Sequence, residues 1–277
     1  RLRKRRKRAL IMSIRARACT LVSGSSGNSI FIENADTRIL VDAGVSAKML
    51  EMAMNGQGID PATLSGILVT HEHSDHISGL SVLARRYKLP VFTTQKTFAA
   101  AKGRLGFAEK IDVRFIAPDV SFEIGSMAFR PFRTPHDAAE SMGFRIDTGY
   151  GVISVASDIG TWTETIAESV SGSNLVFIEA NYDPDMLWFG PYPWPLKKRI
   201  DSEHGHLSNG DCGTAIGRLI HEGSTRFVLI HLSKENNRPD LAYNNIEALL
   251  AAEGARSGSD YTMLTAPRYT PSCWQLL

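Results

Sequence analysis

Three histidines and an aspartate lie within six residues of one another, at His71, His73, Asp75 and His76. Alternate side chains on an extended backbone point to the same side, so His71 and His73 present two neighbouring imidazoles. Asp75 and His76 can face the same hollow once the chain turns into a helix, and they then offer ligands to a second ion. Imidazole and carboxylate together suit Zn²⁺, Mn²⁺ and Fe²⁺. This histidine packet therefore predicts a pair of divalent metal ions.

The packet is expected on a loop between a strand and a helix. The apolar run 67–69 before it is typical of a buried strand, and residues 77–87 after it show apolar side chains at helical spacing. Asp42 occupies a similar place, at the end of a predicted strand over 38–41. Because a buried carboxylate needs a partner, we expect Asp42 to hydrogen-bond to the metal-binding histidines and to fix the orientation of their rings.

Other chemically useful side chains also follow apolar, strand-like runs. His136 comes at the end of one such run, and we interpret it as a further metal ligand because the packet still lacks coordination. Asp158 follows another apolar run, and its carboxylate could bridge both ions there. The positive charge of the two ions would compensate the cost of burying this carboxylate. His231 stands at a third strand end, and Glu179 at a fourth. We therefore expect these side chains to meet at one end of a sheet.

Short strands and helices follow one another along the chain without a linker, repeat or low-complexity segment. Residues 183–195, rich in aromatic residues and proline, are interpreted as an ordered loop, either a lid or a substrate wall. A glycine- and serine-rich turn over 23–28 could bind a phosphate through its backbone N–H groups, and a simple tight turn explains it equally well. Strands are predicted over 14–22, 29–32, 38–41, 67–69, 90–93, 113–116, 120–124, 127–134, 142–148, 151–156, 175–178 and 227–230, and helices over 46–55, 77–87, 95–104, 210–221 and 241–253.

Composition places the chain among globular proteins with a large core. It has 277 residues, of which 43% are hydrophobic, and no run approaches the ~20 apolar residues of a membrane span or resembles a signal peptide. Cys19, Cys212 and Cys273 are widely spaced and form no Cys-x-x-Cys pair, which argues against a disulfide framework or a thiolate zinc site. We expect a cytoplasmic protein.

The formal charge of +2 hides an uneven distribution. Seven of the 31 basic residues lie within residues 1–8, which leaves 24 basic against 29 acidic residues in the rest of the chain. Such a basic octamer could be a nucleic-acid-binding arm. We interpret residues 1–11 instead as a basic extension that is disordered, and residues 12–277 as one domain.

With these residues in hand, the chain resembles the metallo-β-lactamase superfamily over nearly its whole length from Met12. The resemblance rests on five motifs that occur in order. It implies an α/β fold, an αββα four-layer sandwich of two mixed β-sheets flanked by helices. It also implies the ligand sets: His71, His73 and His136 for one metal, Asp75, His76 and His231 for the other, Asp158 between them, and Asp42 as a supporting residue.

Within this superfamily, residues 21–29, 205–209 and 231–237 resemble the YycJ/WalJ group, whose members are associated with cell-wall-stress signalling and with 5′-exonuclease activity on DNA. The pattern is also similar to transfer-RNA 3′-processing ribonucleases, in which a histidine paired with a glutamate assists phosphodiester cleavage. That similarity implies His206 as the assisting histidine and Glu179 as its partner. The long exosite arm of the tRNA enzymes has no counterpart in this chain.

The predicted function is that of a binuclear metal-dependent hydrolase, an enzyme that cleaves phosphodiester bonds with a metal-bridging hydroxide. The cofactors expected are two divalent ions, Zn²⁺ or Mn²⁺, which lower the pKa of a shared water toward ~7. The predicted catalytic residues are Asp75, His206 and Glu179. Nucleic acid is the expected substrate, most specifically DNA attacked by a 5′-exonuclease. Substrate contacts are predicted at Ser25, Asn28, Asn181, Lys197, Lys198, Ser208, Asn209 and Ser233.

Other interpretations remain open from the sequence. The same site could serve a small-molecule phosphodiesterase or a thioester hydrolase, or could belong to a metal-binding regulatory protein without catalysis. The cations at Lys197, Lys198 and Arg199 could contact phosphates or form a solvated helix end. Metal identity, cleavage polarity, DNA against RNA and the oligomeric state are not determined by the sequence.

Overall fold

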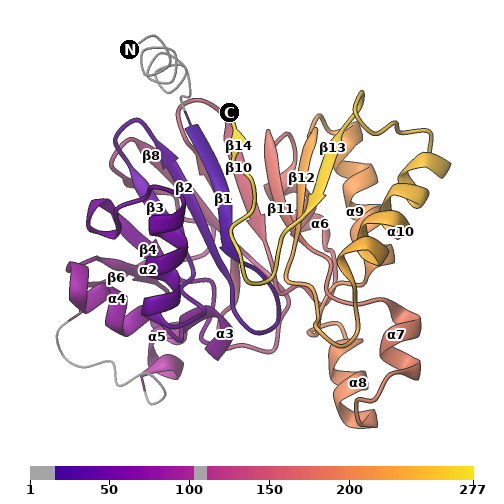
Figure 1. Ribbon diagram of the computed structural model, residues 1–277, viewed down its shortest axis with the longest axis horizontal. Helices are drawn as coiled ribbons and strands as arrows, with labels where there is room; N and C mark the ends of the chain where they lie inside the picture. The colour runs from indigo at the N-terminus through magenta and orange to yellow at the C-terminus, as the bar shows by residue number, and fades with distance from the viewer. Residues whose placement is uncertain (1–15, 103–110) are drawn as a thin grey trace.

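Two seven-stranded β-sheets packed face to face form the centre of the computed structural model, which describes residues 16–102 and 111–277 (Figure 1). In the first sheet β1, β2 and β3 are antiparallel neighbours, whereas β3 to β6 run parallel. Its strands in spatial order are β14 (Gln275–Leu276), β1 (Ala16–Val22), β2 (Ser29–Asn34), β3 (Arg38–Val41), β4 (Gly66–Leu68), β5 (Val91–Thr93) and β6 (Val113–Phe115).

The second sheet is also mixed. Strands β10 to β13 run parallel, and β7, β8 and β9 join them as antiparallel neighbours. Its spatial order is β13 (Thr262–Thr265), β12 (Arg226–Ile230), β11 (Leu175–Glu179), β10 (Val152–Ala156), β9 (Met142–Asp147), β8 (Met127–Arg133) and β7 (Phe122–Ile124).

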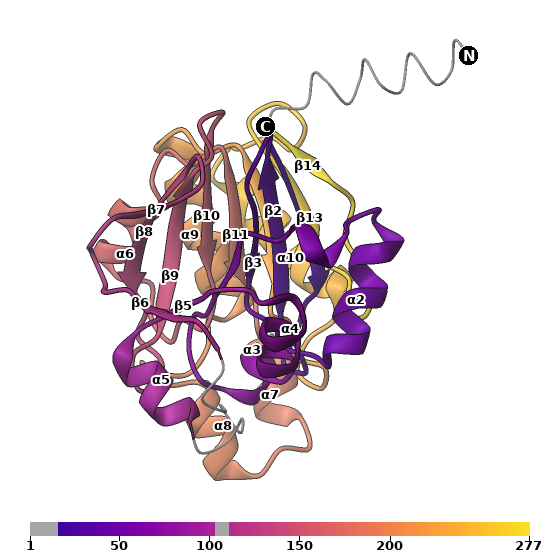
Figure 2. The same ribbon diagram turned by 90° about the vertical axis from the view of Figure 1, so that its left-hand side faces the viewer.

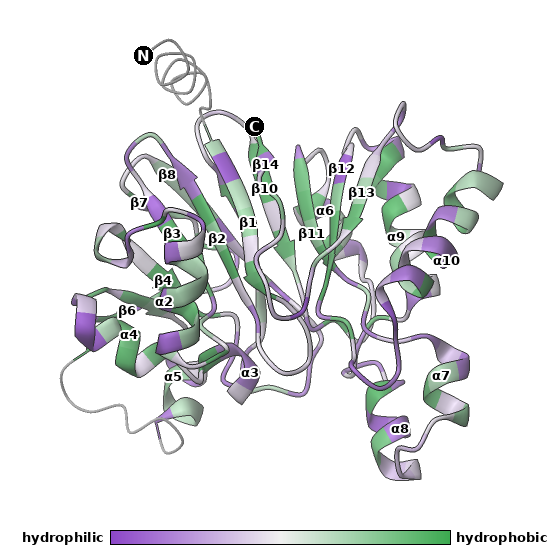
Figure 3. Ribbon diagram, in the orientation of Figure 1, coloured by the Kyte–Doolittle hydropathy of each residue, from purple (hydrophilic) through white to green (hydrophobic). Residues whose placement is uncertain are grey.

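Hydrophobic residues recur along the strands of both sheets (Figure 3), and the buried ones form three layers of core, as expected when strands are hydrophobic on both faces. The inner faces of the sheets pack against each other through residues such as Ile32 and Phe144. Leu40 packs outward with α2 and α4, whereas Ile178 packs outward with α9 and α10. The helices are α2 (Ala47–Gly56), α3 (Ser74–Ile77), α4 (Leu80–Tyr87), α5 (Gln95–Ala101), α6 (Glu164–Val170), α7 (Pro184–Phe189), α8 (Trp194–Ile200), α9 (Asn209–His221) and α10 (Pro239–Ala252), with a short 3-10 turn at Pro61–Thr63.

This arrangement of helix, sheet, sheet and helix confirms the predicted αββα sandwich. Most predicted strands occur within a few residues of their expected bounds. For example, β4 ends at Leu68, one residue before the predicted end, and β7 begins at Phe122, two residues after the predicted start. The predicted helix over 46–55 is α2, and those over 210–221 and 241–253 are α9 and α10. The expectations for residues 1–11, the start of the first strand and the end of the helix over 95–104 lie outside the described residues. No helix in the described part of the chain has the length and apolar character needed to cross a membrane.

Two expectations were wrong in detail. The predicted helix over 77–87 is divided into α3 and α4 at Gly79. A side chain at Gly79 would collide with the backbone oxygen of Val45, because a Cβ there would lie only 2.2 Å from that atom. The stretch 183–195, expected to be an irregular loop, instead contains α7 and the start of α8.

Candidate metal centre

The strand ends that carry chemical groups meet at one end of the two sheets. Strands β3 and β4 run parallel in the first sheet, and β10, β11 and β12 run parallel in the second, so their carboxyl ends lie at common edges. Asp42 and His231 follow a strand directly, and Asp158 follows β10 after one residue; all three adopt left-handed backbone angles, with φ of 63° for Asp42 and 57° for Asp158 and His231. Such angles are costly for residues other than glycine and cluster at functional sites. The backbone turns sharply at these positions and directs each side chain inward.

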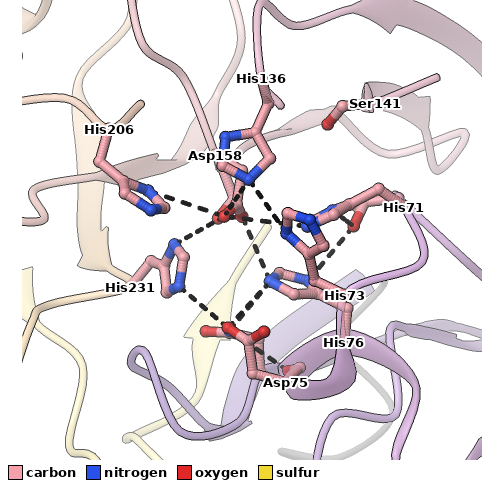
Figure 4. A network of polar contacts seen from close by, with 12 residues as sticks. His71, His73, Asp75, His76, His136, Ser141, Asp158, His206 and His231 are labelled. Atoms are coloured by element: carbon pink, nitrogen blue, oxygen red, sulfur yellow. Dashed lines mark hydrogen bonds and ion pairs between the residues drawn. The ribbon is translucent and has the colours of Figure 1, made fainter. Parts of the chain in front are cut away.

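One group of possible ligands consists of His71, His73 and His136, whose ring nitrogens lie within 4.8 Å of one another (Figure 4). His136 donates its Nδ1 hydrogen to the backbone oxygen of Gly205 at 2.9 Å, so its Nε2 carries a lone pair. This Nε2 lies only 3.2 Å from Nδ1 of His73. Nε2 of His71 is buried without a hydrogen-bond partner. A cation that accepts all three lone pairs explains this arrangement.

A second group consists of Asp75, His76 and His231. Oδ2 of Asp75 lies 3.5 Å from Nε2 of His76 and 3.3 Å from Nε2 of His231. Asp158 lies between the two groups, with its Oδ2 3.3 Å from Nε2 of His76 and its Oδ1 3.5 Å from Nε2 of His136 (Figure 4). The carboxylate of Asp158 can therefore bridge two ions, one in each group.

The electrostatics of the centre favour cations. Burial lowers the pKa of His71 and His136, so both imidazoles are neutral and able to bind metal. Burial also disfavours a charged His231, but the facing carboxylates, Asp158 above all, outweigh it and raise the pKa of this histidine to about 10. In turn the histidines overcome the effect of burial on Asp158 and hold the pKa of its carboxyl well below the usual range. The negative potential that raises the pKa of His231 also attracts a divalent ion.

Asp42 contacts the packet as expected. Its Oδ2 accepts a hydrogen bond from Nδ1 of His76 at 2.7 Å and another from the hydroxyl of Thr70 at 2.8 Å. Because Thr70 gives its hydrogen to Asp42, the Thr70 oxygen can accept the Nδ1 hydrogen of His71 at 3.0 Å. In their neutral forms both histidines therefore carry the hydrogen on Nδ1 and direct an Nε2 lone pair at the centre, a common arrangement around metal-binding imidazoles.

Glu179 is fully buried and serves two histidines at once. Its Oε1 lies 2.8 Å from Nδ1 of His206 and 3.1 Å from Nδ1 of His231, while its Oε2 accepts the N–H of Ile159 at 2.7 Å. His206 is the more exposed of the two, with 15% of its side chain accessible, against 2% for His231. The predicted pairing of Glu179 with His206 is thus present in the geometry, and Glu179 also orients the ring of His231.

Several predicted substrate contacts hold the site loops together instead of pointing outward. Asn181 donates from Nδ2 to the backbone oxygen of His231 at 2.8 Å, and Ser208 caps α9 by accepting the N–H of Asp211 at 3.1 Å. Asn209 exchanges two side-chain hydrogen bonds with Asn237. The hydroxyl of Ser233 accepts the backbone N–H of Asn236, also at 3.1 Å.

The remaining predicted contacts differ in their surroundings. Asn28 lies at the centre, with Nδ2 3.2 Å from Nε2 of His76. Lys197 is buried and donates to the backbone oxygens of Trp188 and Gly190, each at 2.8 Å, so its ammonium stabilises a turn. Ser25 and Lys198 are exposed.

The glycine- and serine-rich turn uses its backbone N–H groups within the protein. The N–H of Gly24 bonds to Asn28 Oδ1, that of Ser25 to the oxygen of Leu232, and that of Gly27 to the oxygen of Gly24. This pattern fits the tight turn, which was one of the two interpretations of residues 23–28.

Four residues that support the centre were not singled out in the sequence. Thr70 has been described above, and the hydroxyl of Ser23 accepts the backbone N–H of His231 at 3.0 Å. Glu72 fixes the loop after His136 by accepting the N–H of Ala139 at 2.8 Å. Only glycine fits at position 44, because a Cβ there would lie 1.7 Å from the backbone oxygen of Asp75. Only Thr70 and Glu72, which adjoin histidines of the packet, carried a signal that could have drawn attention to them.

Comparisons with known proteins agree with this geometry. A model of the beta-lactamase superfamily domain matches residues 37–232. Exodeoxyribonuclease YycJ of Bacillus anthracis is 36% identical over 243 residues, which cover 87% of this chain and 91% of that protein. Exodeoxyribonuclease WalJ of Streptococcus pneumoniae serotype 2 is 35% identical over 243 residues, covering 87% of this chain and 90% of that protein.

A solved structure shows the same fold at low sequence identity. The metallo-beta-lactamase fold protein YhfI of Bacillus subtilis superimposes with a TM-score of 0.70 at 16% identity, covering 93% of this chain and 99% of that one. The fold implies divalent metal ions, and the His and Asp groups described above provide suitable ligands. The chain belongs to the beta-lactamase superfamily.

Proposed function

We propose that this protein is a metal-dependent exodeoxyribonuclease, a hydrolase of phosphodiester bonds in DNA. The observation that carries the proposal is the position of His206. Its ring lies beside Asp158, with Nδ1 3.8 Å from Oδ1, yet it is not needed to complete the two groups that hold the predicted metal ligands. The relatives YycJ and WalJ are named exodeoxyribonucleases, and this chain aligns with nearly their whole length. These names support DNA as the substrate.

We assign Zn²⁺ or Mn²⁺ to the two groups, with Asp158 between them. When bound, such ions supply a water of lowered pKa and neutralise negative charge on a phosphodiester. The carboxylates and imidazoles of the two groups would hold these ions. The carboxylate of Glu179 accepts the Nδ1 hydrogen of His206, and the doubly protonated form of this histidine can donate its Nε2 hydrogen to the leaving oxygen, which leaves the ring neutral. Three unpaired cysteines, two of them buried, support a reducing, cytoplasmic environment.

Metal analysis and hydrolysis assays on the same preparation test this function. We expect two metal ions per chain, hydrolysis of bis(p-nitrophenyl) phosphate, and degradation of 5′-labelled duplex DNA. Asp75→Ala is expected to abolish both activities, whereas Asp112→Ala, which removes an exposed carboxylate paired with Arg114, should retain them. Cleavage of the small ester without any attack on DNA would contradict a nuclease and favour a small-molecule phosphodiesterase. A chain that binds no metal and hydrolyses neither substrate would refute the proposal.

A further inference from the structure

Helices α7 (Pro184–Phe189) and α8 (Trp194–Ile200) form a helical hairpin beside the metal centre. Both helices lie at the end of the molecule that also carries α3, far from the C-terminus (Figures 1 and 2). The hairpin follows β11 and Glu179, and it leads directly into the loop that carries His206. The end of α8 therefore adjoins the centre.

The hairpin has a fixed internal structure. Lys197 donates to the backbone oxygens of Trp188, near the end of α7, and of Gly190, the residue that follows α7. The indole Nε1 of Trp188 donates to Asp201 Oδ2 at 3.0 Å, and Leu187 packs into a small apolar cluster with residues of α8. Because these contacts are made within the hairpin, its outer surface is formed before any ligand binds.

Two large aromatic side chains lie on that outer surface. Phe189 is 88% exposed and Trp194 is 59% exposed. The Trp194 ring lies 5.0 Å from that of Trp188, and the ammonium of Lys198 lies 5.4 Å from the Trp194 ring centroid. Phe189 ends α7 and Trp194 begins α8, so both flank the short connection between the helices, and exposed apolar surface of this kind marks binding sites. A cation beside exposed ring faces suits a ligand that offers both flat rings and negative charge.

The hairpin is also connected to the catalytic groups. The backbone oxygen of Ile200, the last residue of α8, accepts the N–H of His206 at 2.9 Å. Arg199 pairs with Asp137, the neighbour of His136, with 2.9 Å between Nη2 and Oδ1. The C-terminal end of α8 therefore adjoins the segments that carry His136 and His206, and Trp194 lies at the other end of the same helix.

We infer that the α7–α8 hairpin binds single-stranded nucleic acid, with bases stacked on Trp194 and Phe189 and a phosphate near Lys198. This inference rests on the proposed function, because it names the surface that presents the substrate strand. Every base has a π face, so stacking on aromatic side chains combined with a basic residue binds single strands with little sequence preference. The exposed ammonium of Lys198 supplies the positive charge for a phosphate, whereas Arg199 is already paired with Asp137.

Binding of a fluorescein-labelled 12-mer oligothymidylate, measured by anisotropy, tests the inference. All proteins carry Asp75→Ala so that the DNA is not degraded. Base stacking contributes ~1–3 kcal/mol per base, so Trp194→Leu is expected to weaken binding about tenfold, and Phe189→Leu to add to the loss. Trp194→Phe should retain most of the affinity. Lys198→Ala should lower the slope of log K against log salt by about 0.7.

Tyr150→Leu is the matched control, because it removes an exposed aromatic side chain from the turn between β9 and β10, at the opposite end of β10 from Asp158. With Asp75 intact, Trp194→Leu should raise KM for single-stranded DNA and leave hydrolysis of bis(p-nitrophenyl) phosphate unchanged. That unchanged turnover separates loss of strand binding from damage to the metal centre.

Each other outcome overturns the inference. If native protein degrades DNA and the hairpin variants bind the 12-mer as tightly as their parent, the hairpin does not bind the strand, and the proposed nuclease function stands. If sedimentation shows that the hairpin variants dissociate a dimer without losing DNA affinity, the aromatic surface joins two copies instead. If the native chain neither binds nor degrades DNA, the proposed function fails together with the inference.

Discussion

At the scale of single residues, the centre depends on side chains that fix histidine rings without touching a metal. Asp42 is the clearest case, because one carboxylate oxygen accepts hydrogens from both Thr70 and His76. Through Thr70 it also determines which nitrogen of His71 is free. Two ligands, one in each group, are thus oriented by one carboxylate.

Asp42→Asn is expected to weaken metal binding by roughly 10–100-fold, because an amide hydrogen directed at Nδ1 of His76 conflicts with the hydrogen already there. Asparagine tolerates the left-handed backbone at this position, so the change does not add strain. Thr70→Val should act in the same direction through His71 alone. Titration with Zn²⁺ against a competing chelator measures the effect, with Asp112→Ala as the control. Native affinity in Asp42→Asn would show that the ring orientation does not depend on this carboxylate.

His206→Ala is expected to lower kcat on DNA by about 10²–10⁴-fold, the usual contribution of a general acid. The metal content should remain that of the native protein, because the two groups of predicted ligands do not include His206. His204→Ala, two residues away and exposed, is the control. His206 also belongs to a possible cluster with Asp158, Glu179 and His231. Loss of a metal ion from His206→Ala would therefore make this residue a ligand.

At the scale of elements, strand ends were the part of the centre that the sequence could predict. A hydrophobic run followed within two residues by Asp or His is a local pattern, and it placed Asp158 and His231 just after the ends of β10 and β12, where the structure has them. The bond from Glu179 to His231 could not be predicted in the same way. It depends on the parallel pairing of β11 with β12, which places Glu179 opposite Ile230.

The α7–α8 hairpin was not predicted because its prolines resemble helix breakers. Pro184 is the first residue of α7, and Pro195 lies in the first turn of α8. The backbone N–H groups there have no partner within the helix, and proline is favoured at such positions. A run rich in proline and aromatic residues is therefore compatible with two short helices, although its composition suggests a loop.

Arg145 connects β9 to the end of α6, and its loss is expected to destabilise the fold without affecting the centre. Its Nη1 donates to the backbone oxygens of Ser169 and Ser171, at 3.1 and 2.8 Å, and to the hydroxyl of Ser173. Arg145→Met should lower the free energy of unfolding by about 2 kcal/mol, since hydrogen bonds to charged groups are worth ~1.5–3 kcal/mol.

Urea denaturation measures this change, with hydrolysis of bis(p-nitrophenyl) phosphate as the readout of the centre. Arg130→Met is the control, because Arg130 lies directly opposite Arg145 on β8 and is exposed. An equal loss of stability in both variants would show that the lower free energy of unfolding comes from removing an arginine from the surface of the sheet, and not from losing the hydrogen bonds between Arg145 and the end of α6.

At the scale of the whole molecule, the metal centre joins the two sheets. The histidine packet follows β4 of the first sheet, whereas His136, Asp158 and His231 follow β8, β10 and β12 of the second. Each predicted ion has ligands from both sheets. Metal binding should therefore stabilise the packing of one sheet against the other as well as supply chemistry.

Removal of metal is accordingly expected to lower Tm. A ligand present at 100 times its Kd stabilises the folded state by ~2.7 kcal/mol, which corresponds to roughly 5–10 °C for a chain of this size. Calorimetry with Zn²⁺ and after treatment with EDTA measures the shift. Asp75→Ala, which lacks a predicted ligand of the second group, should respond less to EDTA than the native protein. Identical Tm values for the native chain with and without metal would mean that the ions, if bound, do not hold the two sheets together.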